Sequence, residues 1–256
     1  MSAVERERRG NVEILTINRP KARNAINGEV SQALSAALDE LSVDHECTVV
    51  ILTGAGDKSF SAGMDLKAFA AGEAASIMGL TGGFAGITQR FFPKPLIAAV
   101  NGTCLAGGCE IMLSCDLVVA AAHATFGIPE AKRGLVAGAG GLFRLPKRLP
   151  RAIALELGLT GNPIDAQRAA QIGLINRVVP ADRLMEEALA LAGEIAENAP
   201  LAVHWTKRMM IEAADLPEHE AWKLNAEAVA TVFSSADAME GPVAFAEKRK
   251  PNWQGK

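Results

Sequence analysis

Hydrophobic and polar positions change period along the first half of the chain, and each period predicts a different element. The segments VEILTI at 12–17 and TVVILT at 48–53 are short apolar runs rich in β-branched residues, as is typical of buried strands. A helix face lies between them, marked by apolar residues at steps of four, four and three: Val30, Leu34, Leu38 and Leu41. The order strand, helix, strand predicts a layered α/β domain.

The same order returns further along the chain. Residues 96–100 are expected to form a strand, and residues 107–115 a short helix. Residues 116–121 are expected to form another apolar strand. From about residue 180, strand-like runs stop and Ala, Leu and Glu dominate. Two helical stripes mark this part: Leu184, Ala188, Leu191 and Ile195, then Ala226, Val229 and Phe233.

The change in pattern predicts two regions. Residues 1–195 are expected to form the α/β core domain, and residues 196–256 a helical region. The apolar faces of these helices exceed what they can bury among themselves. We therefore expect them to pack partly on their own domain and partly on another copy of the chain.

Composition and charge narrow the class of protein. Hydrophobic residues make up 49% of the 256 and charged residues 21%, which excludes a disordered chain and predicts a compact soluble one. The net charge of −3 gives no attraction to nucleic acid or to an anionic membrane. No apolar run approaches the roughly 20 residues of a membrane span. The N-terminal MSAVERERRG is neither a secretory signal nor a transit peptide, so the expected location is cytoplasmic.

The cysteines predict neither disulfides nor a metal site. Three of the four lie among apolar residues, where a small buried thiol packs well, and their spacing matches no zinc pattern: Cys47, Cys104, Cys109 and Cys115.

Glycines concentrate in three loops, at 53–66, 101–113 and 134–145, and these are the candidate site loops. None fits a phosphate-binding loop or a dinucleotide-binding fingerprint, and the chain has no Gly-x-Ser-x-Gly elbow. Gly107 and Gly108 open a helix, where free backbone N–H groups can stabilise an oxyanion, and the turn at 61–64 offers a second set of donors. The alternative is that these glycines only permit a tight turn and close packing.

Two carboxyls follow in glycine-rich, apolar surroundings. Glu110 lies in the first turn of the helix at 107, and Glu130 follows the next strand. Apolar surroundings raise the pKa of a carboxyl, and two such groups can divide acid and base roles. The alternatives are that Glu110 only complements the helix dipole and that Glu130 only pairs with Lys132 or Arg133.

At these residues the sequence resembles the crotonase, or enoyl-CoA hydratase/isomerase, superfamily along essentially its whole length. The matching stretches, in family order, are NRPKARNAI, ILTGAGDKSFSAGMDLK, PLIAAVNGTCLAGGCEIMLSCDLVVA, FGIPEAKRGLVAGAGG, LTGNPIDAQRAAQIGLINRVV and EGPVAFAEKRKPNW. The resemblance implies an α/β fold, a crotonase-type spiral of ββα units, followed by a C-terminal helical region that makes trimers or dimers of trimers. It also implies a substrate carried as an acyl-CoA thioester, with no metal and no cofactor beyond that coenzyme A.

The resemblance also implies roles for individual residues. Glu110 and Glu130 match the two acids of the hydratase subgroup. The amides of Met64 and Gly107 match the oxyanion-hole donors, and Gly138 matches the glycine whose amide helps to hold the reacting water. Ala106 stands where many hydratases have a third glycine, and Ala137 where proline is common.

Further residues match positions that bind the substrate. Those expected to contact coenzyme A are Lys21, Arg23, Ala62, Asp65, Leu66, Lys67 and Lys248, the last reaching a neighbouring subunit. The segment at 72–92 falls over the acyl pocket, with Phe84, Ile87 and Phe91 as pocket candidates. Exposed Lys and Arg are also ordinary surface residues, and the three apolar residues could equally be ordinary packing.

The implied activity is reversible hydration of a 2-enoyl-CoA to a 3-hydroxyacyl-CoA, with Glu130 as the acid/base at C2 and Glu110 as the water activator. GGFAG, the Leu-Pro-Lys run at 145–147 and EGPVAFAEKR resemble carnitinyl-CoA dehydratase-like members, so a lyase for a branched or polar acyl-CoA is one alternative. A Δ3,Δ2-enoyl-CoA isomerase, which needs one acid only, is a second. A non-catalytic acyl-CoA-binding or RNA-associated homologue is a third.

Overall fold

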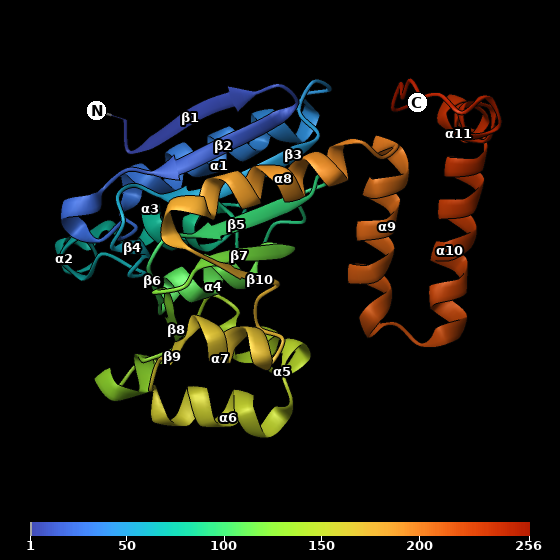
Figure 1. The fold of residues 1–256 in the computed structure, drawn as a ribbon. Helices are drawn as coiled ribbons and strands as arrows, with labels where there is room; N and C mark the ends of the chain where they lie inside the picture. The colour runs from blue at the N-terminus through green and yellow to red at the C-terminus, as the bar shows by residue number, and fades with distance from the viewer. Residues whose placement is uncertain (1) are drawn as a thin grey trace.

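The computed structural model describes residues 2–256, which form two β-sheets surrounded by helices (Figure 1). The strands of the larger, six-stranded sheet, in spatial order, are β1 (Val4–Arg9), β2 (Val12–Ile17), β3 (Val49–Gly54), β5 (Leu96–Val100), β7 (Leu117–Ala121) and β10 (Arg177–Val179). Those of the four-stranded sheet are β4 (Ser59–Ser61), β6 (Thr103–Leu105), β8 (Thr125–Gly127) and β9 (Ile164–Asp165).

The helices complete the spiral. In the first half of the chain they are α1 (Gly28–Val43), α2 (Leu66–Ala68), α3 (Ala74–Met78) and α4 (Gly107–Leu113). In the second half they are α5 (Gly141–Arg148), α6 (Arg151–Thr160), α7 (Ala166–Gln171), α8 (Leu184–Ala196), α9 (Pro200–Glu212), α10 (Glu218–Phe233) and α11 (Ala236–Glu247).

Each turn of the spiral adds one strand to each sheet. The pairs β3 and β4, β5 and β6, and β7 and β8 are consecutive in the chain, and their members lie in different sheets. Within each sheet the strands from successive turns are parallel, for example β5 beside β7 and β6 beside β8. This arrangement confirms the predicted α/β spiral of ββα units. It also stacks the loops that end β4 and β6 on one another.

The larger sheet is covered on both faces, which explains why its central strands are continuous apolar runs. The predicted face of α1 packs on one side, with Val30, Leu34, Leu38 and Leu41 fully buried. The helix begins where the side chain of Asn27 accepts a hydrogen bond from the N–H of Val30 at 3.1 Å. On the other side α8 buries Leu184, Ala188 and Leu191. The apolar stripes predicted both helices, and the short apolar runs predicted the central strands to within one residue.

The strand β1 was not predicted, because its sequence VERERR is mostly charged and its side chains are mostly exposed. It pairs with β2 in antiparallel register at the edge of the sheet. Arg6 and Arg8 of β1 donate from their Nε atoms to opposite oxygens of the buried Glu13 carboxylate, at 2.8 and 2.5 Å. A polar edge strand of this kind is stabilised by cross-strand ion pairs rather than by an apolar face.

The last three helices stand away from the core (Figure 1). Helices α9 and α10 run antiparallel, and the predicted boundary at 195/196 falls at the end of α8. The predicted apolar stripe on α10 is exposed to solvent, with Phe233 75% exposed. On α11, Met239 and Phe245 are 70% and 87% exposed.

Two further expectations concern the whole chain. All four cysteines are free and buried, as predicted. Over residues 2–256 we find no helix that combines the length and the apolar character needed to cross a membrane.

Candidate active site

The amide of Met64 is aimed away from its neighbouring segment. Ile26 donates to the Gly63 carbonyl at 2.8 Å, and Asp65 donates to the Ile26 carbonyl at 2.8 Å. In this parallel bridge the N–H of Met64 points to the side opposite Ile26. The next spiral turn lies close to the preceding residue, since a Cβ on Gly63 would lie 2.7 Å from the Gly107 nitrogen. The structure therefore brings the amide-bearing segments of Met64 and Gly107 together.

Gly107 is the first residue of α4, so its N–H has no carbonyl partner within the helix. Its direction is set by Ala106, which takes φ +53° and ψ −132°, a conformation that glycine adopts easily and alanine at a cost of order 1 kcal/mol or more. A Cβ on Gly107 would lie 2.6 Å from Cε1 of the Phe84 ring. Glycine at 107 is therefore required by this contact.

The three acyl-pocket candidates separate in the structure. Phe84 is buried against Gly107, and Ile87 is buried in the same core cluster. Phe91 is 41% exposed, and its ring lies 6.2 Å from that of His204 in α9 and 5.8 Å from Nζ of Lys207. Phe91 thus belongs to the surface facing the C-terminal helices, where it lines one cavity together with Ile87, and Phe84 is not among the residues that line that cavity.

Glu110 is buried on α4 and held by one oxygen. Its Oε1 accepts hydrogen bonds from the N–H groups of Ala139 at 2.7 Å and Gly141 at 2.9 Å. Burial raises the pKa of Glu110, while these two amides and the nearby charge of Arg144 oppose the rise. Its other oxygen, Oε2, accepts no hydrogen bond from any part of the chain that the structure describes, so it can accept one from a bound molecule.

Glu130 opens a short 3₁₀ turn (Glu130–Arg133) after β8. Its Oε2 is buried and has no hydrogen-bond partner among residues 2–256. Burial raises the pKa of Glu130, and the charge of Glu110 raises it further, while Arg133 lowers it. The two carboxyls are therefore near enough to interact. The pKa values of both carboxyls are thus raised, and two such groups that act on each other can serve as an acid and a base.

The loop between 134 and 141 contacts Glu110 through two residues that the sequence analysis did not single out. Ala139 and Gly141 donate to Glu110, whereas Gly138 is exposed, with no atom within 4 Å of where a Cβ would stand. The role of Gly138 in holding water stays a prediction. The sequence of a glycine-rich loop does not indicate which of its N–H groups will bind a carboxylate that is distant in the chain.

The residues expected to contact coenzyme A lie in different settings. Lys21 and Arg23 are exposed, and Arg23 accepts a hydrogen bond at its carbonyl from the N–H of Ala62 at 3.1 Å. Asp65 accepts from Lys67 N–H at 3.0 Å and forms an ion pair with Arg19 at 2.9 Å, so it holds the start of α2.

Three further positions are at the periphery. Leu66 and Lys67 are exposed on α2, beside this group. Lys248 ends α11, far across the molecule from α2 (Figure 1). Within one chain it cannot join the other coenzyme A candidates.

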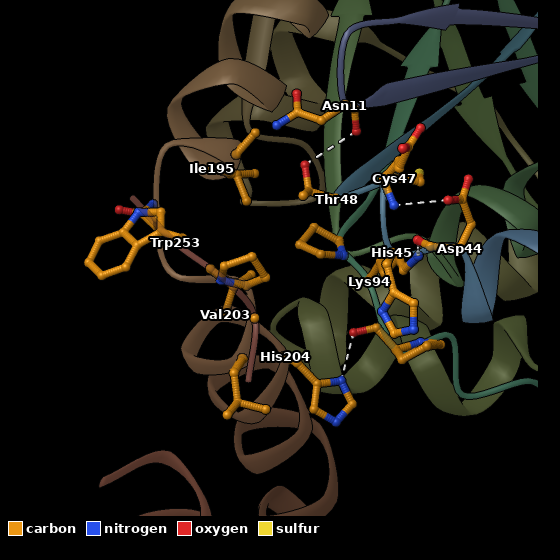
Figure 2. Close-up of a pocket in the computed structure, with 18 of the residues that line it drawn as sticks. Asn11, Asp44, His45, Cys47, Thr48, Lys94, Ile195, Val203, His204 and Trp253 are labelled. Atoms are coloured by element: carbon orange, nitrogen blue, oxygen red, sulfur yellow. Dashed lines mark hydrogen bonds between the residues drawn. The ribbon is translucent and has the colours of Figure 1, made fainter. Parts of the chain in front are cut away.

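A separate groove of about 760 Å³ lies between the core and the C-terminal segment, and neither Glu110 nor Glu130 lines it (Figure 2). Three of its polar side chains are already engaged. Nδ1 of His204 lies 2.9 Å from the Pro93 carbonyl oxygen, Nζ of Lys94 donates to the Leu41 carbonyl at 2.5 Å, and Thr48 donates to the Asn11 carbonyl. This groove is a gap left by the projecting helices, and it brings no reactive group toward Glu110.

Comparison with known proteins agrees with this geometry. Residues 7–256 match the family described as Enoyl-CoA hydratase/isomerase, and the chain belongs to that family. It is 44% identical over 253 residues to the carnitinyl-CoA dehydratase of Proteus mirabilis, covering 97% of each chain.

Solved structures extend the comparison. An enoyl-CoA hydratase from Mycobacterium marinum is 49% identical, with a TM-score of 0.96 over 100% of both chains. A probable enoyl-CoA hydratase/isomerase from Mycobacterium abscessus is 53% identical, with a TM-score of 0.94 over 100% of both chains. A carnitinyl-CoA hydratase from Mycobacterium avium is 49% identical, with a TM-score of 0.79 over 100% of both. The chain is thus an enzyme of the hydratase and dehydratase type within the crotonase family.

Proposed function

We propose that this chain is an enoyl-CoA hydratase, which adds water reversibly across the C2=C3 double bond of a 2-enoyl-CoA thioester to give a 3-hydroxyacyl-CoA. The observation that carries the proposal is the coupled pair of carboxyls. Glu110 is held at one oxygen by two amides, and Glu130 has a raised pKa and a buried, unpartnered oxygen. A reaction that moves one proton from water and delivers one to carbon needs such a base and such an acid.

In this mechanism one water lies between the carboxyls. Ionised Glu110 takes a proton from the water as its oxygen bonds to C3, and the π electrons of the double bond pass to the thioester as an enolate. Glu130 then gives its proton to C2, and the thioester carbonyl is restored. The proton left on Glu110 returns to Glu130 through solvent or the next water, so the pair is reset.

The enolate oxygen is where negative charge develops. The amides of Met64 and Gly107 would donate to it, and each fixed donor of this kind is worth about 3 kcal/mol of barrier. Acid–base groups and amide dipoles supply all the steps, so we expect no cofactor other than the coenzyme A of the substrate.

A second candidate is dehydration of carnitinyl-CoA, the same chemistry run in the direction of water loss. It is favoured by the 44% identity to carnitinyl-CoA dehydratases over nearly the whole chain. An isomerase is less well supported, because a proton shuttle between C2 and C4 leaves the amide-held Glu110 without a role.

We also propose that the working form is a homotrimer or a dimer of trimers. The support is the exposed apolar surface of the projecting helices, including Phe233 and Phe245, which a single chain leaves open to water. Light scattering at micromolar concentration tests this, and a monodisperse monomer would overturn it.

The proposed activity is tested by the loss of conjugated-thioester absorbance with crotonyl-CoA. A panel that includes long-chain enoyl-CoA and carnitinyl-CoA then separates the two candidates by kcat/KM. Glu110→Gln and Glu130→Gln should each lower kcat at least about 10²-fold, as expected for lost acid–base groups. Glu156→Gln, on the exposed face of α6, is the matched control. Full activity in both site variants would refute the proposal.

A further inference from the structure

Arg144, in the first turn of α5, is a half-buried charge that the proposed mechanism does not use. We propose that Arg144 is the positioning residue for the water-activating carboxylate of Glu110, holding the loop whose amides bind that carboxylate without touching the substrate itself. This inference rests on the proposed hydratase function and adds a residue to its site.

The first support is a direct relay through Ala139. The N–H of Ala139 donates to Oε1 of Glu110 at 2.7 Å, and the carbonyl of the same residue accepts from Nη1 of Arg144 at 3.1 Å. A shift of the guanidinium would therefore move Ala139, whose N–H binds Glu110.

The second support is the space made for the guanidinium. Gly140 has φ +104°, and a Cβ there would lie 2.2 Å from Nη1 of Arg144 and 3.0 Å from its Cζ. The backbone N–H of Arg144 also donates to the Gly140 carbonyl at 3.1 Å. The loop thus folds around the arginine, and a side chain at 140 would displace it.

The third support is the opposite attachment of the same side chain. Nη2 of Arg144 donates to the carbonyl of Thr88, which follows the segment of Phe84 and Ile87. Phe84 lies against Gly107, so one guanidinium joins the loop that holds the base to the segment behind the oxyanion donor. The hydroxyl of Thr88 is buried with no partner in residues 2–256, so the contact from Arg144 to the carbonyl is the attachment that Thr88 makes to α5.

The positive charge of Arg144 also favours the ionised form of Glu110. Arg144 forms no ion pair within 4.0 Å among the described residues, and its charge acts on Glu110, lowering the pKa of that carboxyl against the effect of burial. Burial lowers the pKa of Arg144 itself. Three other charged groups lie in this region. The charge of Glu110 raises the pKa of Glu130, and the charge of Arg133 lowers it. The charge of Arg148 lowers the pKa of Arg144.

Three variants test the proposal by their pH profiles of kcat/KM. Arg144→Met should lower kcat about 10²-fold with little change in KM, because the base is displaced while the substrate contacts stay. The acidic limb of the kcat/KM profile of this variant should move to higher pH, because the pKa of Glu110 rises when the positive charge of Arg144 is removed. Arg144→Lys should restore the limb but only part of kcat, because a single ammonium cannot bond both carbonyls with the geometry of the guanidinium. Arg148→Met, one turn further along α5, removes the same charge and should keep the wild-type limb.

A second readout does not depend on activity. Infrared titration of ¹³C-glutamate-labelled protein follows the carboxyl band, and the component lost in Glu110→Gln identifies Glu110. The expected result is a higher Glu110 midpoint in Arg144→Met than in wild type. If wild type hydrates no enoyl-CoA, the proposed function fails, while this titration still decides the role of Arg144.

The proposal is overturned if folded Arg144→Met keeps both the wild-type kcat and the wild-type Glu110 midpoint. Should Arg144→Met fail to fold, Gly140→Ala supplies the test, because its Cβ would displace the guanidinium while keeping its charge. A wild-type kcat in Gly140→Ala would then overturn the proposal, and a loss matching that expected for Arg144→Met would support it.

Discussion

Lys207 of α9 donates from Nζ to Oδ2 of Asp116, just before β7, at 2.6 Å, and this ion pair joins the projecting helices to the core. The same carboxylate oxygen accepts from the N–H of Leu96 at 2.7 Å, and Nζ of Lys207 also donates to the Lys94 carbonyl at 2.8 Å. The lysine and aspartate side chains are only 11% and 21% exposed. Burial raises the pKa of Asp116 even with Lys207 beside it.

Replacing Lys207 by Met should therefore destabilise the fold. Asp116 would be left as a largely buried carboxylate without its partner, a change worth about 2 to 3 kcal/mol after discounting for partial exposure. The free energy of unfolding from urea titration measures it. Lys147→Met, which breaks an exposed pair with Asp215, should cost less than about 1 kcal/mol, and equal losses in the two variants would contradict the argument.

Gly107→Ala should lower kcat by about 10²- to 10³-fold, the usual effect of losing one oxyanion donor. The added Cβ would meet the Phe84 ring at 2.6 Å, so the amide must shift away from its direction. Steady-state hydration kinetics give the result. Gly193→Ala in α8, where a Cβ meets no atom within 4 Å, is the control and should retain the wild-type kcat.

Ala106→Gly should stabilise the protein by about 0.5 to 1 kcal/mol, because relief of the positive-φ strain exceeds the added entropy of the unfolded chain. The position has φ +53° and ψ −132°, so glycine loses nothing in the native conformation. Thermal unfolding measures the change. The same substitution at Ala190, exposed in the middle of α8, should instead destabilise by about 1 kcal/mol, and a matching sign at both sites would be inconsistent with strain at 106.

Glu130→Gln should change the pH dependence of stability. The native pKa of Glu130 is raised above its ordinary value of 4.5, so between these two values the native protein binds more protons than the unfolded chain. Stability contributed by protonated Glu130 is present below pH 4.5 and is lost as the pH rises through the native pKa. Relative to the variant, wild type should therefore lose stability over that window.

Denaturation at a series of pH values checks this expectation. In a Glu110→Gln background the same comparison should give a smaller pH dependence, because the charge of Glu110 contributes to the raised pKa of Glu130. A wild-type advantage that grows with pH would reverse the sign and refute the account.

Periodicity was sufficient to predict the covered parts of the fold. The buried face of α1 repeats at the helical spacing of three and four residues, and the strands β3 and β5 are short, continuous apolar runs of strand length. The charged edge strand β1 and the two- or three-residue strands of the smaller sheet carry no such period. Their pairing depends on tertiary neighbours, which a single sequence does not display.

The site divides in the same way. Glu110 and Glu130 were singled out because acids in apolar, glycine-rich surroundings are unusual. Arg144 was not found, because its contacts with Ala139 and Thr88 depend on how two remote loops fold against each other. Phe91 was grouped with Phe84 and Ile87 because their segment matches the one over the acyl pocket in the family, and the structure places Phe91 on the surface that faces α9, in a cavity that Ile87 also lines.

The nearness of Gly63 to Gly107 bears on when activity can first arise in a newly made chain. In the proposed mechanism the two amides that donate to the thioester oxygen come from consecutive turns of the spiral, and one turn alone would supply a single donor. Catalysis by that mechanism should therefore appear only after the two turns have packed together, so turnover would report a late step of folding that partly folded chains do not reach.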